Sequence, residues 1–171
     1  MKKIALLCAL VMYVALSAQN LTMNELYNLR QQSLSQVDSY LKKNGWSFVK
    51  GAEPGHNKMG SAFYEYHTYD DVPTISYLYS RAGVRRVMLR MKSEELYDEY
   101  LTELTTQSGR PETKKDALGG LVKIFKGKTT TFCLTEANVS SSSGAKSMLY
   151  FVTLYANRDF ETQVRHKFTD L

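Results

Sequence analysis

Cysteine, proline and tryptophan are scarce in this chain of 171 residues, which has 2 cysteines, 3 prolines and 1 tryptophan. The cysteines, Cys8 and Cys133, are too few for the disulfide framework of a small secreted module. The chain also lacks a hydrophobic run of about 20 residues, the length that spans a bilayer as a helix. We therefore expect a fold stabilised by core packing, without a transmembrane anchor.

The longest apolar run lies at the N-terminus. Two lysines precede an uncharged stretch, residues 4–16, and the small residues Ser17 and Ala18 follow it. A positive start, an apolar stretch of this length and small residues at its end are typical of a secretory signal peptide. We predict that residues 1–18 are a signal peptide cleaved after Ala18, with cleavage after Ser17 as the alternative. The protein would then be exported, to the periplasm or out of the cell.

Residues 19–171 are predicted to form a single domain. Losing the two lysines of the signal lowers the formal net charge from +5 to +3. A chain of this length buries enough surface for one core, and the 12 tyrosines argue against disorder. The small charge, together with export, disfavours a nucleic acid partner.

Helix signals open the first half of this domain. Thr22 and Glu25 have the spacing of a capping box, and leucines at helical intervals continue to Asn44-Gly45, which predicts one amphipathic helix over residues 22–44. Trp46 and Phe48 directly follow the helix stop, so we expect both in the core. Aromatic and β-branched residues between turn formers predict the strands 46–51, 62–69, 74–81 and 84–92.

The second half repeats this order more weakly. Ser93 caps a helix that stops near Gly109, strands are predicted over 120–125, 128–136 and 147–156, and a short helix over 158–171. Phe-Val-Lys-Gly and Ile-Phe-Lys-Gly close corresponding strands, which suggests a weak tandem repeat. The order helix, strands, helix, strands along the chain indicates an α+β fold, with a largely antiparallel sheet and helices packed on one face.

A partial resemblance follows from these features. A signal peptide, a capped leucine-rich helix and the sequence Lys-Lys-Asn-Gly-Trp-Ser-Phe at 42–48 resemble small uncharacterised exported proteins of the Bacteroidota type. The resemblance covers the first third of residues 19–171 and implies a compartment rather than an activity. The two-part layout is also similar to inhibitor-like periplasmic binding domains, an analogy of architecture alone.

Residues capable of catalysis or metal binding do not form a motif. His56, His67 and His166 lack ligand spacing, so solvated or structural roles are favoured, although Asp70 and Asp71 lie near His67. Cys133 lies in a strand pattern without an activating neighbour, which indicates a packed thiol. No nucleophile elbow or phosphate loop is present in the sequence. We predict no catalytic, metal or cofactor site.

The predicted hairpin over residues 74–92 is the strongest binding candidate. Alternation places Arg86, Arg90 and Lys92 on one face of its second strand, while Tyr77 and Tyr79 share a face of the first. If these residues lie on the same side of the sheet, they form an aromatic and cationic surface of the kind enriched in protein interfaces. The alternative is that the tyrosines belong to the core and the basic residues are merely solvated.

These observations favour an exported, noncatalytic binding module of the bacterial envelope. Its partner would be a protein or an anionic envelope component, and no cofactor is expected. The alternative is a periplasmic or secreted, hydrolase-like enzyme whose site is assembled from scattered residues.

Overall fold

The computed structural model describes residues 21–69, 71–117, 119–140, 144 and 146–170. The predicted signal peptide, residues 1–18, lies outside the described residues. Within those ranges no helix is both long and apolar enough to cross a membrane.

Helices and strands follow one another in two similar series. The first series is α2 (Met23–Gln31), α3 (Leu34–Lys43), β1 (Ser47–Ala52), β2 (Gly60–Glu65), β3 (Thr74–Tyr79) and β4 (Arg85–Met91). The second is α4 (Glu94–Ser108), β5 (Glu112–Lys115), β6 (Leu121–Lys126), β7 (Thr130–Ser140) and β8 (Lys146–Ala156). The C-terminal segment contains α5 (Asn157–Asp159), the π-helical turn η1 (Phe160–Val164) and the 3-10 turn η2 (Arg165–Lys167).

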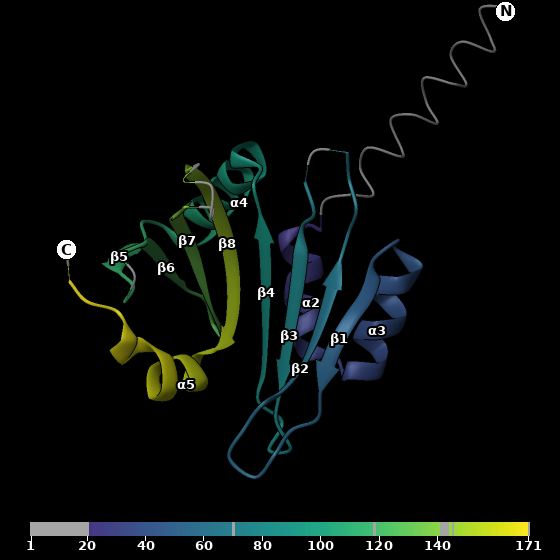
Figure 1. The fold of residues 1–171 in the computed structure, drawn as a ribbon. Coiled ribbons are helices and arrows are strands. Elements are labelled where there is room, and N and C mark those ends of the chain that lie inside the picture. The colour runs from purple at the N-terminus through teal and green to yellow at the C-terminus, as the bar shows by residue number, and fades with distance from the viewer. Residues whose placement is uncertain (1–20, 70, 118, 141–143, 145, 171) are drawn as a thin grey trace, which may run out of the picture.

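The strands form one antiparallel sheet in the order β1-β2-β3-β4-β8-β7-β6-β5 (Figure 1). The predicted α+β class with a largely antiparallel sheet is confirmed. Each half of the chain is a helical segment followed by a four-stranded meander, and the fourth strands of the two meanders, β4 and β8, pair at the centre. This is the layout that the suggested repeat implies, although β5 was absent from the predicted strands.

The single helix predicted over residues 22–44 is wrong, because the chain breaks between α2 and α3. Gln32 is extended, with φ −81° and ψ 159°, and Ser33 begins α3 with a second capping box to Gln36. The hydroxyl of Tyr77 donates a 2.6 Å hydrogen bond to the carbonyl of Gln32. The break is thus stabilised by a local cap and by a contact with the sheet. The first capping box, of Thr22 and Glu25, is formed as predicted.

The main core lies between the sheet and the helices α2, α3 and α4. Trp46 is 3% exposed and belongs to it, as predicted. The prediction for Phe48 is wrong, because this side chain is 48% exposed on the edge strand β1, where it packs edge-on against Tyr64. The core residues that the strands contribute include Ala62, Tyr64, Ile75, Tyr77, Val87, Leu89, Met91, Val152 and Leu154.

The C-terminal segment lies on the other side of the sheet. Phe160 and Val164 pack against Val122, Ile124 and Cys133 in a second hydrophobic cluster. The prediction that helices pack on one face therefore holds for α2, α3 and α4, whereas the helical turns after β8 cover part of the opposite face (Figure 1).

Candidate functional site: the open face of the sheet

Strand register determines which side chains share the side of the sheet opposite α2, α3 and α4. Partners across neighbouring antiparallel strands project to the same face. Met88 is opposite Ser76 on β3 and Thr153 on β8, and Arg90 is opposite Thr74 and Phe151. We name as the open face the part of this side that the C-terminal segment leaves uncovered. It includes Phe63, Glu65, Thr74, Ser76, Leu78, Met88, Arg90, Phe151 and Thr153.

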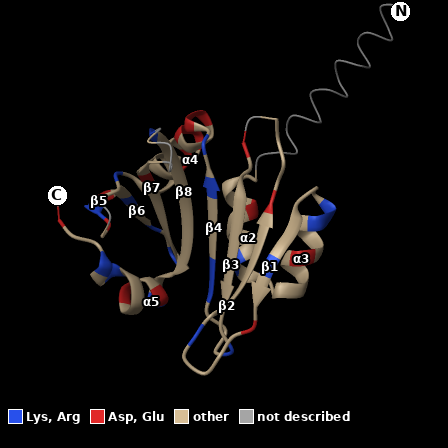
Figure 2. Cartoon of the chain, viewed as in Figure 1, with Lys and Arg blue, Asp and Glu red and all other residues tan. Residues whose placement is uncertain are grey.

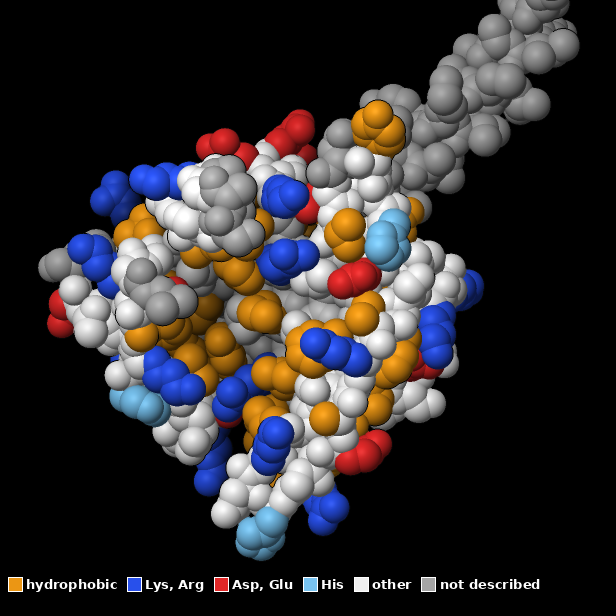
Figure 3. All heavy atoms as spheres, viewed as in Figure 1, with side chains coloured by type: hydrophobic (Ala, Val, Ile, Leu, Met, Phe, Trp, Pro, Cys, Tyr) orange, Lys and Arg blue, Asp and Glu red, His pale blue; other side chains and the backbone are white. Residues whose placement is uncertain are grey.

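The open face is hollowed and largely apolar. Ser76 is buried, and the other members of the open face are half-buried. Figure 3 shows hydrophobic side chains gathered in the hollow at the middle of the sheet, with Lys and Arg side chains distributed around them. The hollow therefore presents apolar surface to solvent within a basic surround.

The predicted aromatic members of the site lie on the wrong side of the sheet. Tyr77 is opposite Val87 and Tyr79 is opposite Arg85, so both tyrosines face the helices. Tyr77 is fully buried and stacks on Tyr79 at 5.9 Å between ring centroids. The structure therefore does not bring the tyrosines together with Arg86 and Arg90. The aromatic rings on the open face are instead Phe63 and Phe151, which the sequence analysis did not single out.

Arg86 is committed to an internal ion pair. Its Nε and Nη2 donate to Asp159 Oδ2 and Oδ1 at 2.7 and 2.9 Å, and the guanidinium lies 5.7 Å from the centroid of the Tyr155 ring. The side chains of Arg86 and Asp159 are only 18% and 5% exposed. The hydrogen bonds that Arg86 donates to Asp159 raise the pKa of Arg86. Arg86 thus fastens the C-terminal segment to the sheet and is not a free binding residue.

Arg90 is held in place by neutral groups. Its Nε donates to Thr74 Oγ1 at 3.1 Å, and its Nη2 donates to the carbonyl oxygen of Val72 at 2.9 Å. No carboxylate among the described residues lies within 4.0 Å of its guanidinium, although the side chain is half-buried. The structure therefore orients the positive charge of Arg90 without neutralising it.

Two lysines add positive charge at the margin. Lys92 is exposed just beyond β4, with its Nζ 3.9 Å from Asp71 Oδ1. Lys50 Nζ lies 5.4 Å from the ring centroid of Phe63. Figure 2 shows basic residues along β4 and on β1. Lys92 thus adds a cation just past the end of β4, and Lys50 extends the basic margin across the sheet.

Nucleophilic and metal-ligating groups lie away from the open face. Cys133 is buried in the cluster beneath the C-terminal segment, and burial raises the pKa of its thiol. The described residues contain no group of three or more His, Cys, Asp or Glu side chains able to hold a metal ion. The open face itself therefore offers apolar contact, one fixed cation, Arg90, and one carboxylate, Glu65, rather than a nucleophile or a metal site.

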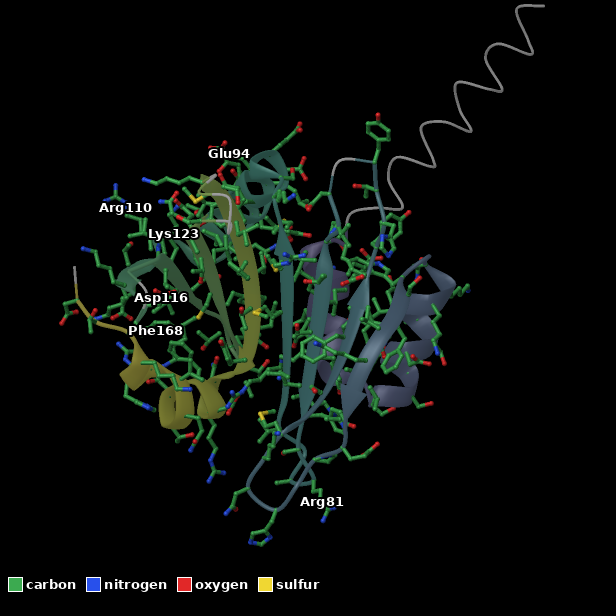
Figure 4. All side chains as sticks on the ribbon, viewed as in Figure 1. Arg81, Glu94, Arg110, Asp116, Lys123 and Phe168 are labelled. Carbon is green, nitrogen blue, oxygen red and sulfur yellow. The ribbon has the colours of Figure 1, made fainter. Side chains whose placement is uncertain are left out.

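A second polar cluster lies on the helix side of the sheet, between α4 and strands β6 and β7. The hydroxyl of Tyr97 donates to Glu136 Oε1 at 2.8 Å, and Lys123 pairs with the same carboxylate. Burial raises the pKa of Glu136, but hydrogen bonds from Lys123 and Tyr97 outweigh it and lower that pKa overall. Lys123 extends from β6, as labelled in Figure 4. The three groups satisfy one another and connect α4 to the sheet.

Comparison with protein-family models, with curated proteins and with solved structures finds no match to this chain. Its function is therefore argued from the geometry of the open face.

Proposed function

We propose that this protein is an exported, noncatalytic binding module of the bacterial envelope that binds another protein through the open face. The observation that supports this proposal is the uncovered apolar surface at the centre of the sheet. Antiparallel sheets commonly have one face on the core and one face in water, and the solvated face is then polar. Here the solvated positions of the central strands include Phe63, Leu78, Met88 and Phe151.

The distribution of covering elements supports this choice of surface. The helices α2, α3 and α4 cover one side of the sheet, and the C-terminal segment covers the β6 and β7 portion of the other. The remaining apolar surface spans four adjacent strands, from β2 to β8. Contiguous exposed apolar surface with a polar margin is typical of an interaction site.

The side chains present favour binding over catalysis. A hydrolase needs a nucleophile or activated water beside a base, with donors for a developing negative charge. The open face contains phenylalanine, leucine, methionine and hydroxyl side chains, with Arg90 and Glu65 as its charged members and no histidine or cysteine among the residues named. Aromatic residues, methionine and arginine are the types enriched at the centres of protein interfaces.

Site-specific photocrosslinking in the envelope of the source cell tests the proposal. A photoreactive phenylalanine analogue replaces Thr153 in the open face or, as a matched control, exposed Thr102 on α4. We expect one discrete adduct from position 153 that is absent from position 102. Identical adducts from both positions, or no adduct from position 153, would contradict binding through the open face. Turnover in a hydrolase screen, lost on a single substitution, would instead support the enzyme alternative.

A further inference from the structure

We infer that the open face recognises an acidic side chain within an apolar protein segment, and that Arg90 is the anchor for that carboxylate. This inference rests on the proposed function and names the chemistry of its partner.

The two arginines on this side of β4 give an internal comparison. Arg86 forms a bidentate ion pair with Asp159, so a carboxylate fits the fork of an arginine on this surface. Arg90 lies on the same face of β4, four residues further along, but its guanidinium donates to a hydroxyl and a carbonyl oxygen instead of a carboxylate. A guanidinium has five N–H donors, so these two hydrogen bonds leave others available. No described carboxylate therefore pairs with Arg90 in the way that Asp159 pairs with Arg86.

The surroundings of Arg90 make a carboxylate partner favourable. Phe151 lies directly opposite it on β8, and Met88 is the next residue on the same face of β4. Apolar neighbours lower the local dielectric, which strengthens an ion pair once a partner excludes water. The hydrogen bonds to Thr74 and Val72 fix the guanidinium in advance, so less side-chain entropy is lost on binding. An oriented arginine that becomes buried at the centre of an interface is a typical hot spot.

The shape of the surface favours a protein segment over a small anion. The row of apolar side chains Phe63, Leu78, Met88 and Phe151 crosses four adjacent strands, so the apolar surface extends well beyond the reach of one phosphate or sulfate group. A peptide segment would contact this row and also place a carboxylate at Arg90. Lys50, Arg90 and Lys92 outnumber the carboxylates beside them, Glu65 and Asp71, which favours approach of an acidic segment over a basic one.

Nuclear magnetic resonance with two blocked tripeptides tests the inference on the purified exported protein. The peptides are acetyl-Phe-Glu-Phe-amide and acetyl-Phe-Gln-Phe-amide, which differ only in the charge of the central residue. We expect the glutamate peptide to shift the Arg90 Nε–Hε resonance and to bind about tenfold more tightly, because charge-assisted hydrogen bonds are stronger than neutral ones. Its binding should weaken as salt concentration rises.

Matched variants assign the effect to Arg90 rather than to net charge. Arg90→Gln should abolish the preference for the glutamate peptide. Arg81→Gln removes the same charge from the exposed turn between β3 and β4, at the far end of the hairpin in Figure 4, and should retain the preference. If Arg90→Gln fails to fold, Arg90→Lys decides the question: it keeps the charge but loses the planar fork, and most of the preference should disappear.

The outcomes separate this inference from the proposed function. Equal binding of both peptides at the open face would overturn the role of Arg90 while leaving the binding surface in place. Equal shifts of Arg90 by inorganic phosphate alone would also overturn it, since they would show a general anion site. Concentration-dependent self-association that blocks the peptides would identify a second copy as the occupant, docked through the exposed acidic residues of α4, Glu94, Glu95, Asp98 and Glu99, and would overturn it. Failure of photocrosslinking from position 153, with the peptide preference intact, would count against the proposed function alone.

Discussion

Arg86 and Arg90 lie on the same face of β4 and differ in what they contact, so their roles in stability differ. The carboxylate of Asp159 is 5% exposed and compensates the charge of Arg86. Asp159→Asn should destabilise the fold by about 3 kcal/mol, because it leaves a largely buried guanidinium without its counter-charge. Urea unfolding measures the loss. Lys42→Ala breaks the exposed pair with Asp38 and should change stability by less than about 1 kcal/mol. Equal effects of the two substitutions would contradict a structural role for Arg86.

Trp46 and Phe48 provide a second test at the residue scale, because they are close in sequence and differ in burial. Trp46 is 3% exposed and Phe48 is 48% exposed. Trp46→Ala should destabilise the fold by about 3 to 5 kcal/mol through loss of buried surface and creation of a cavity. Phe48→Ala should have a clearly smaller effect on the urea midpoint. A larger effect from Phe48 would mean that β1 is covered in solution.

The face on which each predicted binding residue lies was set by one turn. Alternation in β3 and β4 correctly grouped the tyrosines together and the arginines together. Whether the two groups shared a face depended on hairpin register, because a slip of one residue moves every side chain to the other side. Tyr79 is opposite Arg85, and Ser80 N–H donates to the Val84 carbonyl to close the turn between them. A register shifted by one would have placed Tyr77 beside the arginines, and sequence alternation alone does not distinguish the two.

Other elements were predictable to different extents for physical reasons. Every strand of the sheet except β5 was recognisable from its aromatic and β-branched residues, and helix α4 was recognisable from its apolar periodicity and its Ser93 cap. The break between α2 and α3 was readable from the Ser33 and Gln36 spacing, but continuing leucine periodicity outweighed it. Strand β5 was missed because its sequence, Glu-Thr-Lys-Lys, has weak β-propensity, and pairing with β6 and a bridge from Lys115 to Thr169 stabilise it instead. Such long-range partners are not encoded locally.

The connection between α4 and the sheet should depend on pH. The pKa of Glu136 is lowered from 4.5 in the folded protein, so its ion pair contributes stability at neutral pH. That contribution is present above the unfolded pKa and is lost as pH falls through the lower folded pKa. Acidification from pH 7 to about pH 3 should therefore reduce the stability of Glu136→Gln less than that of the wild type. Thermal unfolding at both pH values measures this, with exposed Glu99→Gln as a control that should behave like the wild type.

Export is a property of the whole molecule, and its direct test is the N-terminus of the mature protein. If residues 1–18 act as a signal peptide, the exported protein should begin at Gln19. Edman sequencing of the protein recovered from the periplasm or the medium checks this. A product beginning at Ala18 would support the alternative cleavage site, whereas an intact Met1 in the exported protein would contradict the signal peptide.

The pairing of β4 with β8 at the centre of the sheet determines when the sheet can be completed during synthesis. Because β8 follows the other seven described strands along the chain, the central pairing of β4 with β8 can form only after those strands have been synthesised. Until residues 146–156 are available, β4 is an unprotected strand edge of the kind that promotes aggregation. Chains shortened before β8 should therefore accumulate as proteolysed or aggregated material rather than as a stable half-protein. The first meander would therefore need protection from aggregation, for example by chaperones, for the time needed to deliver the second.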